Sequence, residues 1–328
     1  MILMEAFKDR TSKLNRPCWP RRGERIMAHL RQAIYFAPRG KSRLMDLGRH
    51  ILTHYFNMDD RLIGFVGGPG AGKSLLVEGM LKDFVLTNDD KGVNIRPLPL
   101  IEAYYNGYFK HNVYHLDAQF EMAFYSADEL VKAVNKAIAH ERRVFIEHFE
   151  RLYPMLGLNA QVLIGIGEEV IVTRPGLFGP DPAAMFEYVR ESLIYRKMAH
   201  TAEELVSLAL QDQEIALPEH YSEVQHGFIM EFRTYPSIDL QKLEQRVNEM
   251  IAQDLPIKSL DPEKNEIWIG DQSIYCTGPR VHVNSTGKIN DFRLSREIKR
   301  DPISQRYLLI GRVGTPEGSL IEQRREMF

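Results

Sequence analysis

The sequence predicts an α/β domain, in which helices cover both faces of a parallel sheet, followed by a smaller α+β domain. Three observations indicate this order. Apolar, strand-like runs alternate with helical segments over residues 59–197, which is typical of a parallel sheet. Beyond residue 198, helices give way to short strands that succeed one another, as in an α+β domain. The 328 residues are also enough for two domains, each with its own core.

Composition places the chain among globular proteins. Hydrophobic residues make up 44% of it and charged residues 26%, both ordinary values for a folded domain. No apolar run approaches the roughly 20 residues that span a bilayer, so we expect no membrane association. The two cysteines, Cys18 and Cys276, are too few for a disulfide scaffold and suit a reducing compartment. The sequence therefore predicts a cytoplasmic protein.

The first segment, residues 1–58, predicts a basic and mainly helical extension. Prolines and a glycine leave helical candidates near residues 23–36 and 42–56. Basic residues are interleaved there with aromatic ones such as Trp19 and Tyr35, a mixture that suits contact with a phosphate backbone such as that of tRNA. A solvated extension that packs on the acidic remainder of the chain is the alternative, and the sequence leaves both open.

One short motif in the first domain carries a definite chemistry. Residues 67–74 fit the pattern G-x-x-x-x-G-K-[ST], after an apolar run at 62–66 and before a helical segment. This context predicts a P-loop, whose backbone N–H groups and helix N-terminus bind the phosphates of ATP or GTP. Lys73 would reach the β- and γ-phosphates, and the hydroxyl of Ser74 would bind Mg²⁺. The predicted nucleotide-binding residues are Gly67, Gly68, Gly70, Ala71, Gly72, Lys73 and Ser74.

The remaining elements of the first domain follow from periodicity and capping. We expect a helix from the P-loop to about Thr87 and an extended segment at 95–101. Ser126, with Glu129 three residues later, is typical of a helix N-terminus. Apolar runs then predict strands at 144–147, 162–166 and 170–173. We expect a loop at 176–182 and a helix at 183–198. Glu147 ends the first of these strands, where an acid commonly holds Mg²⁺ directly or through water.

Two further segments carry a resemblance to known kinases. They are Ile101-Glu102-Ala103-Tyr104-Tyr105-Asn106 and His115-Leu116-Asp117-Ala118-Gln119-Phe120. With the P-loop, they resemble the uridine kinase and phosphoribulokinase group over roughly residues 60–197. The resemblance implies that Glu102 is the catalytic general base, beside Lys73 and Glu147, and that Tyr105 and Asp117 face the acceptor. A carboxylate can orient an attacking hydroxyl and take its proton.

The chain departs from that kinase group in two ways. Glu102 stands where the group has aspartate, and the arginine-rich run of the group's lid is missing from the sequence. Arg174, Arg190 and Arg196 are the candidates for stabilising the transferring phosphoryl group instead. Phosphoryl transfer therefore follows less directly from the sequence than nucleotide binding does.

The second domain carries a different resemblance. Its segments are His200–Leu205, Gln225–Phe232, a periodic helix at 239–253, Asp254–Ile257, Cys276–Val283 and Ser285–Ile289. Their order and spacing resemble the second additional domain of threonyl- and alanyl-tRNA synthetases over residues 198–312. That domain hydrolyses mischarged aminoacyl-tRNA, in many members around zinc. The resemblance implies tRNA or an aminoacyl-adenosine-like end as a partner.

The residues of that editing centre are only partly matched. His200 and Cys276 agree with the pattern, but Glu204 replaces one histidine and Arg280 stands where the last should be, with His282 two residues on. The side chains of His200, Glu204, Cys276 and His282 could still supply four donors to Zn²⁺. An arginine among them is unfavourable for a cation. If residues 280–283 form a strand, Arg280 and His282 share one face. We therefore expect zinc-dependent editing to be lost or altered.

Taken together, the sequence predicts an ATP-binding P-loop protein with three alternatives for its activity. The first is an ATP-dependent phosphotransferase, with Mg²⁺ as cofactor, acting on a nucleoside-like or RNA-linked acceptor that the synthetase-like domain selects. The second is an aminoacyl-tRNA editing hydrolase gated by the nucleotide domain. The third is a non-catalytic, nucleotide-dependent tRNA-binding regulator.

Overall fold

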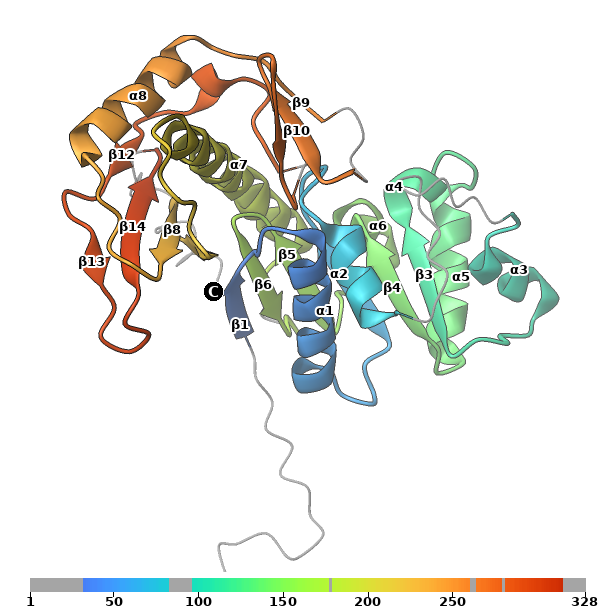
Figure 1. Cartoon of the computed structure of the whole chain (residues 1–328). Coiled ribbons are helices and arrows are strands. Elements are labelled where there is room, and N and C mark those ends of the chain that lie inside the picture. Colours follow the sequence, from blue (N-terminus) through green and yellow to red (C-terminus); the bar gives the residue numbers. More distant parts are fainter. Residues whose placement is uncertain (1–31, 83–95, 177–178, 260–263, 279–280, 315–328) are drawn as a thin grey trace, which may run out of the picture. The chain divides into compact units, whose positions relative to one another are not determined.

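Six strands of the first half form one mixed, mostly parallel sheet (Figure 1). The computed structural model describes residues 32–82, 96–176, 179–259, 264–278 and 281–314. The chain divides into two units, residues 1–30 and 31–328, and every described residue belongs to the second. The strands, in the order β1-β6-β5-β2-β4-β3 across the sheet, are β1 Gln32–Phe36, β6 Glu169–Thr173, β5 Val162–Ile166, β2 Leu62–Val66, β4 Arg143–Glu147 and β3 Val113–Asp117.

Loop lengths explain where the sheet is parallel. β2, β3, β4 and β5 pair in parallel because helical segments separate them in sequence. Between β5 and β6 only Gly167 and Glu168 remain, and a two-residue connection can only reverse the chain. β1 adds to the far side of β6, also antiparallel. The prediction of an α/β fold is therefore confirmed, with an antiparallel edge that the sequence did not show.

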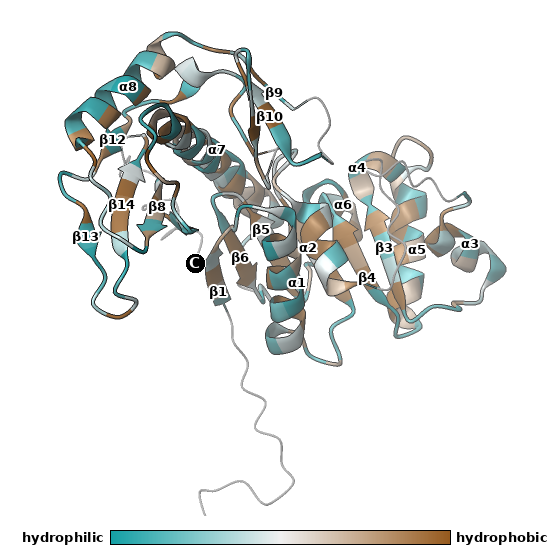
Figure 2. Cartoon of the chain, viewed as in Figure 1, coloured by the Kyte–Doolittle hydropathy of each residue, from teal (hydrophilic) through white to brown (hydrophobic). Residues whose placement is uncertain are grey.

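Helices cover both faces of this sheet. They are α1 Lys41–Tyr55, α2 Lys73–Met80, α3 Pro99–Asn106, α4 Ala118–Glu121, α5 Ala127–Ala139, α6 Phe149–Leu156 and the start of α7 Pro182–Asp212. Along β2, Ile63 and Phe65 belong to a core with α1 and α2, whereas Leu62 and Val66 belong to a core with α3, α5 and α6. This alternation is the period of two that puts successive strand residues on opposite faces. The strands β4, β5 and β6 are correspondingly brown in Figure 2.

Three predictions for this half were wrong in detail. The described part of the helix expected at 23–36 is strand β1, and α1 buries Leu44 and Ile51 in the first-half core. Residues 32–55 thus join the sheet and its helices. The extended segment expected to end at residue 101 is helix α3 from Pro99 onward, where proline suits the first helical turn. The helix after the P-loop motif, expected to reach Thr87, ends at Met80.

The second half is built on the C-terminal part of α7. Its five-stranded sheet contains β7 His220–Val224, β8 Gly227–Phe232, β12 Arg293–Leu294, β13 Lys299–Arg300 and β14 Tyr307–Arg312. A three-stranded sheet contains β9 Ile257–Lys258, β10 Glu266–Ile269 and β11 Gln272–Tyr275. Helix α8 Leu240–Ala252 and the short helix η2 Thr286–Lys288 complete it.

One continuous helix crosses the domain boundary expected at residue 198. α7 runs for 31 residues, and its residue Leu193 packs in the first-half core while Met198 and Ala202 pack in a separate second-half core. The strand expected at 280–283 is absent over its described part, because Val281–Val283 is irregular, and Arg280 lies outside the described residues. Among the described residues, no helix has the length and apolar character that crossing a bilayer requires.

Candidate functional site

The 67–74 loop connects the end of β2 to the first turn of α2. Gly72 has a φ of +104°, and a Cβ there would lie 2.3 Å from Cδ2 of Leu44. Gly67 comes so close to β5 that a Cβ would lie 2.6 Å from the carbonyl oxygen of Ile166. Only glycine fits both positions without displacement of its neighbours. The geometry matches the strand, glycine turn and helix that the motif needs.

Lys73, Ser74 and Glu147 lie together at this loop. The ammonium group of Lys73 donates to the carbonyl oxygens of Gly67, at 2.9 Å, and Gly68, at 3.2 Å. The hydroxyl of Ser74 donates to Oε2 of Glu147 at 2.9 Å. Two hard oxygen donors thus lie side by side at the end of β4, and Mg²⁺ prefers such donors.

The carboxylate of Glu147 is buried and held ionised. Its Oε1 lies 3.0 Å from Nε2 of His115, which is buried beside it on β3. Burial acts to raise the pKa of Glu147, but His115, the charge of Lys73 and the hydrogen bond from Ser74 outweigh it, so that the pKa lies below its ordinary value. An ionised carboxylate is the form that binds a metal ion.

A second acid, Asp117, stands at the end of the neighbouring strand. In the parallel pairing of β3 and β4 it is the register partner of Glu147. Its side chain also caps α4 by accepting from the backbone N–H of Phe120 at 3.0 Å. Burial and then the negative charge of Glu147 raise the pKa of Asp117. A carboxyl group with a raised pKa is better suited to accept a proton than an ordinary aspartate.

These residues open onto a cavity of about 370 Å³. It is lined by loop residues Pro69–Leu75, by Asp117 and Glu147, by Arg196, and by Gly278 and Val281. The last two residues come from the second half of the chain. The cavity therefore combines the loop, two acids and a segment that lies about 200 residues further along the sequence.

Of the three arginines considered for the phosphoryl group, one lines the cavity. Arg196, on α7, donates to the carbonyl oxygens of Ala71 at 2.8 Å, Pro38 at 2.9 Å and Gly167 at 3.4 Å. Its guanidinium group thus ties the loop to two other segments. Arg174 instead forms two 2.7 Å hydrogen bonds to the carboxylate of Asp60, and Arg190 pairs with Glu187 on the surface of α7.

Two predicted acceptor-site residues are not brought to the cavity. Glu102 is exposed on α3, and the structure does not place it among the lining residues. Tyr105 is 67% exposed on the same helix, and its hydroxyl donates to the carboxylate of Glu129. Both lie on α3 because the segment expected to be a strand leading into the site is helical. Asp117, at the end of β3, is the acid that lies beside Glu147 instead.

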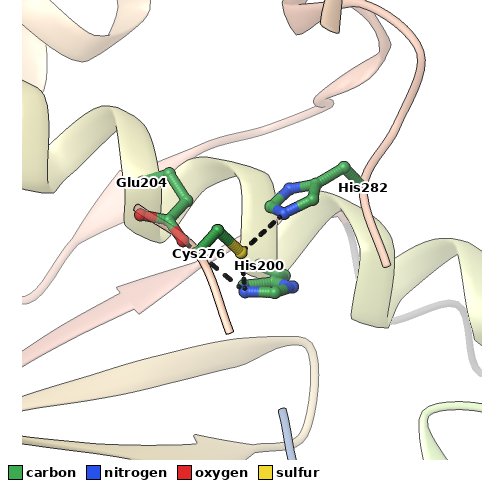
Figure 3. A group of neighbouring side chains, drawn as sticks. All are labelled: His200, Glu204, Cys276 and His282. Carbon is green, nitrogen blue, oxygen red and sulfur yellow. Dashed lines mark hydrogen bonds and ion pairs between the residues drawn. The ribbon is translucent and has the colours of Figure 1, made fainter. Parts of the chain in front are cut away.

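The four candidate metal ligands of the second half lie in one cluster (Figure 3). Their donor atoms are all within 4.8 Å of one another. Sγ of Cys276 is 3.2 Å from Nε2 of His282 and 3.5 Å from Nε2 of His200, and Oε1 of Glu204 is 3.7 Å from Nε2 of His200. Ligands on a tetrahedral zinc ion lie about 3.3–3.6 Å apart. The donor set therefore fits Zn²⁺ after small movements.

The hydrogen bonds around the cluster fix both histidine rings. Nδ1 of His200 lies 3.1 Å from the carbonyl oxygen of Val281, which can only accept, so this nitrogen carries the proton. Nδ1 of His282 lies 3.3 Å from the hydroxyl of Thr201, which already donates to Lys197. Both Nε2 lone pairs are therefore left facing Cys276. This is the arrangement found around histidines that bind metals.

Burial sets the charge of the cluster. It lowers the pKa of His200 well below its usual range and that of His282 to about 3, so that both rings are neutral. It raises the pKa of Glu204 to about 7 and also raises that of the Cys276 thiol. Neutral imidazoles are the form that binds a metal, whereas the acid and the thiol would release protons as a cation binds.

A second cavity, of about 560 Å³, lies against this cluster. His200, Glu204 and Cys276 form part of its wall, together with Arg39 and Tyr221. Arg39 is buried between the carboxylates of Glu203 and Glu223. The cluster is thus reached from this cavity, while Gly278 and Val281, which lie close to Cys276 and His282 in the sequence, border the first one.

No protein-family model matches the chain, and no curated protein is significantly similar to it. The site therefore rests on its own geometry. Sequence reasoning did not find the contact between His115 and Glu147, although His115 lies two residues before Asp117 on the same side of a strand. It offered no signal for Gly278 and Val281 as cavity residues.

Proposed function

We propose that the chain binds a magnesium nucleoside triphosphate in the 370 Å³ cavity and transfers its γ-phosphoryl group to an acceptor. The observation that carries the proposal is the hydrogen bond between Ser74, which follows Lys73 in the loop, and Glu147 at the end of β4. Ser74 and Glu147 would hold Mg²⁺, and Lys73 would bind the β- and γ-phosphates. The loop N–H groups and the N-terminus of α2 would bind the remaining phosphate oxygens.

Among the described residues that line the cavity, we assign activation of the acceptor to Asp117. It lines the cavity beside Glu147, and its raised pKa favours taking a proton. An acceptor hydroxyl would attack the γ-phosphorus, its proton would pass to Asp117, and the bond from the γ-phosphorus to the β,γ-bridging oxygen would break. Glu102 was expected in this role, but its exposed position on α3 favours Asp117.

A second candidate, an aminoacyl-tRNA deacylase, is favoured by the 560 Å³ cavity that reaches His200, Glu204 and Cys276. Four protein donors would complete a tetrahedral shell, however, and a catalytic zinc keeps one position open for water or substrate. The donor set therefore supports a structural ion better than a hydrolytic one. We rank phosphoryl transfer first and regard a nucleotide-dependent, non-catalytic regulator as the outcome if binding occurs without turnover.

The test combines calorimetry with an assay of ADP release. We expect the chain to bind Mg-ATP or Mg-GTP, Lys73→Met to abolish binding, and candidate nucleosides or tRNA to stimulate ADP release. Asp117→Asn should lower stimulated turnover about 10²–10⁴-fold with nucleotide affinity changed less than about threefold. Glu102→Gln, an exposed carboxylate outside the cavity, is the matched control.

Three results would count against this proposal or against the role of Asp117 in it. Failure of the intact chain to bind either nucleotide removes it altogether. Loss of turnover in Glu102→Gln but not in Asp117→Asn would indicate that Glu102 on α3 is the general base. Release of amino acid from mischarged tRNA without ATP, lost on changing Cys276, would favour the deacylase.

A further inference from the structure

The wall of the nucleotide cavity and the four-donor cluster share one segment of chain. Gly278 and Val281 line the cavity, while Cys276 and His282, on either side of them in sequence, belong to the cluster. The two lining residues are joined by a hydrogen bond from the N–H of Val281 to the carbonyl oxygen of Gly278, at 3.0 Å. A ligand that holds Cys276 and His282 in place would therefore also restrict the movement of Gly278 and Val281.

Two hydrogen bonds connect the wall directly to the cluster. The backbone N–H of Gly278 donates to Sγ of Cys276 at 3.3 Å, and the carbonyl oxygen of Val281 accepts from Nδ1 of His200 at 3.1 Å. The second bond orients a metal-binding histidine through its other ring nitrogen, an arrangement that affects metal affinity strongly. Here the partner of that nitrogen is itself a cavity residue.

The wall also packs tightly against the segment that precedes α1. A Cβ on Gly278 would lie 2.8 Å from Cε1 of His200 and 3.4 Å from the backbone nitrogen of Gly40, and a Cβ on Gly40 would lie 3.0 Å from Oγ1 of Thr277. Gly40 lines the cavity, and Pro38, two residues before it, accepts a hydrogen bond from Arg196, which also holds the loop at Ala71. Gly278 is therefore closely packed against both His200 of the cluster and Gly40 of the cavity wall.

From these contacts we infer that a zinc ion bound by His200, Glu204, Cys276 and His282 is a structural clamp on the nucleotide cavity, so that zinc and Mg-nucleotide strengthen each other's binding. The inference rests on the proposed nucleotide binding. The donors hold the ion, the ion fixes Cys276 and His282, and the described stretches around them, 276–278 and 281–283, present Gly278 and Val281 to the nucleotide. Because such coupling is reciprocal, bound nucleotide must raise zinc affinity by the same factor.

The experiment measures both sides of this coupling on the full chain. Zinc content is determined by mass spectrometry, and Mg-ATP affinity by calorimetry, for zinc-loaded protein, for protein stripped with a chelator and for stripped protein given zinc again. Competition with a chromophoric chelator then gives zinc affinity with and without Mg-ATP. We expect one zinc per chain and about tenfold tighter Mg-ATP binding with zinc, within the range usual for coupled sites.

Variants separate the clamp from a general loss of structure. Cys276→Ser should bind Mg-ATP like stripped wild type and gain nothing from added zinc, whereas Cys18→Ser, the other cysteine, should behave like wild type. Circular dichroism of stripped wild type checks that the fold persists without zinc. Equal Mg-ATP affinity with and without zinc, or no zinc binding at all, overturns the inference while nucleotide binding stands. Failure of every form to bind nucleotide overturns the proposed function as well.

Discussion

Arg196 is the residue whose replacement tests most directly how the 67–74 loop is held. Its guanidinium group is buried and donates to three backbone carbonyl oxygens, two of them at 2.8 and 2.9 Å. A hydrogen bond from a charged donor contributes about 1.5–3 kcal/mol, so the two short bonds amount to about 3–6 kcal/mol. Burial lowers the pKa of Arg196 to about 10, which reflects a cost of keeping the charge inside.

Replacement by methionine keeps an unbranched apolar stem like that of arginine and removes both the donors and the buried charge. Because loss of the charge offsets part of the lost bonding, we expect Arg196→Met to lower the free energy of unfolding by about 2–3 kcal/mol. Since one partner is Ala71 in the loop, Mg-ATP affinity should also fall by about tenfold or more. Urea unfolding followed by circular dichroism, and calorimetry, measure the two effects.

Arg190→Met is the control on the same helix. Arg190 is about half exposed and pairs with Glu187 one turn away on the surface, so its loss should change stability by no more than about 0.5 kcal/mol. If Arg196→Met and Arg190→Met unfold at the same urea concentration and bind Mg-ATP equally well, Arg196 does not hold the loop and the reasoning fails.

Two further predictions concern the loop and the β5–β6 turn. Gly72→Ala should abolish Mg-ATP binding, because the new Cβ would meet Leu44 and the residue has a φ of +104°. Gly157→Ala is the control, since Gly157 has a φ of +71° with nothing within 4 Å of the new Cβ. It should lower the free energy of unfolding in urea by only about 1–2 kcal/mol and leave the Mg-ATP affinity measured by calorimetry unchanged. Burial raises the pKa of Glu168 from 4.5 to about 8, so its stabilising contribution is complete below pH 4.5 and lost as the pH rises through 8. Between these values Glu168 should lower the free energy of unfolding by up to about 1.4 kcal/mol per pH unit. Glu168→Gln should remove this contribution, so that its slope differs from that of the wild type by this amount; an unchanged slope contradicts the assignment.

The parts of the fold that the sequence predicts well are those with a local cause. The strand at 62–66, the turn at 67–72 and the helix capped by Ser126 each depend on residues within one or two turns of chain, and all three are present. Helix α3 was not predicted, because Pro99 lies in a run that fits an extended segment, although proline is equally suited to a first helical turn. Local pattern did not distinguish the two.

The site residues also differ in whether their contacts have a local cause in the sequence. Ser74 and Glu147 could be placed together because a P-loop helix and an adjacent parallel strand end meet at one edge of a sheet. The structure brings His200, Glu204, Cys276 and His282 together as the resemblance to synthetase editing domains suggested. By contrast, Asp60, which pairs with Arg174, and Ala71 and Pro38, which accept from Arg196, lie more than 100 residues away in the sequence. No periodicity or spacing encodes such contacts, so the role of each arginine could not be predicted.

The uninterrupted course of α7 determines how the protein can be divided. Leu193 rests in one core and Ala202 in the other, less than three turns apart on the same rod. A fragment ending near residue 198 would cut this helix at a run of consecutive buried residues, 198–203, and would part the buried Arg39 from Glu203 and Glu223. Neither half should therefore fold by itself as the intact chain does, and melting should be cooperative across both. Fragments for crystallisation or binding studies should keep residues 182–212 whole.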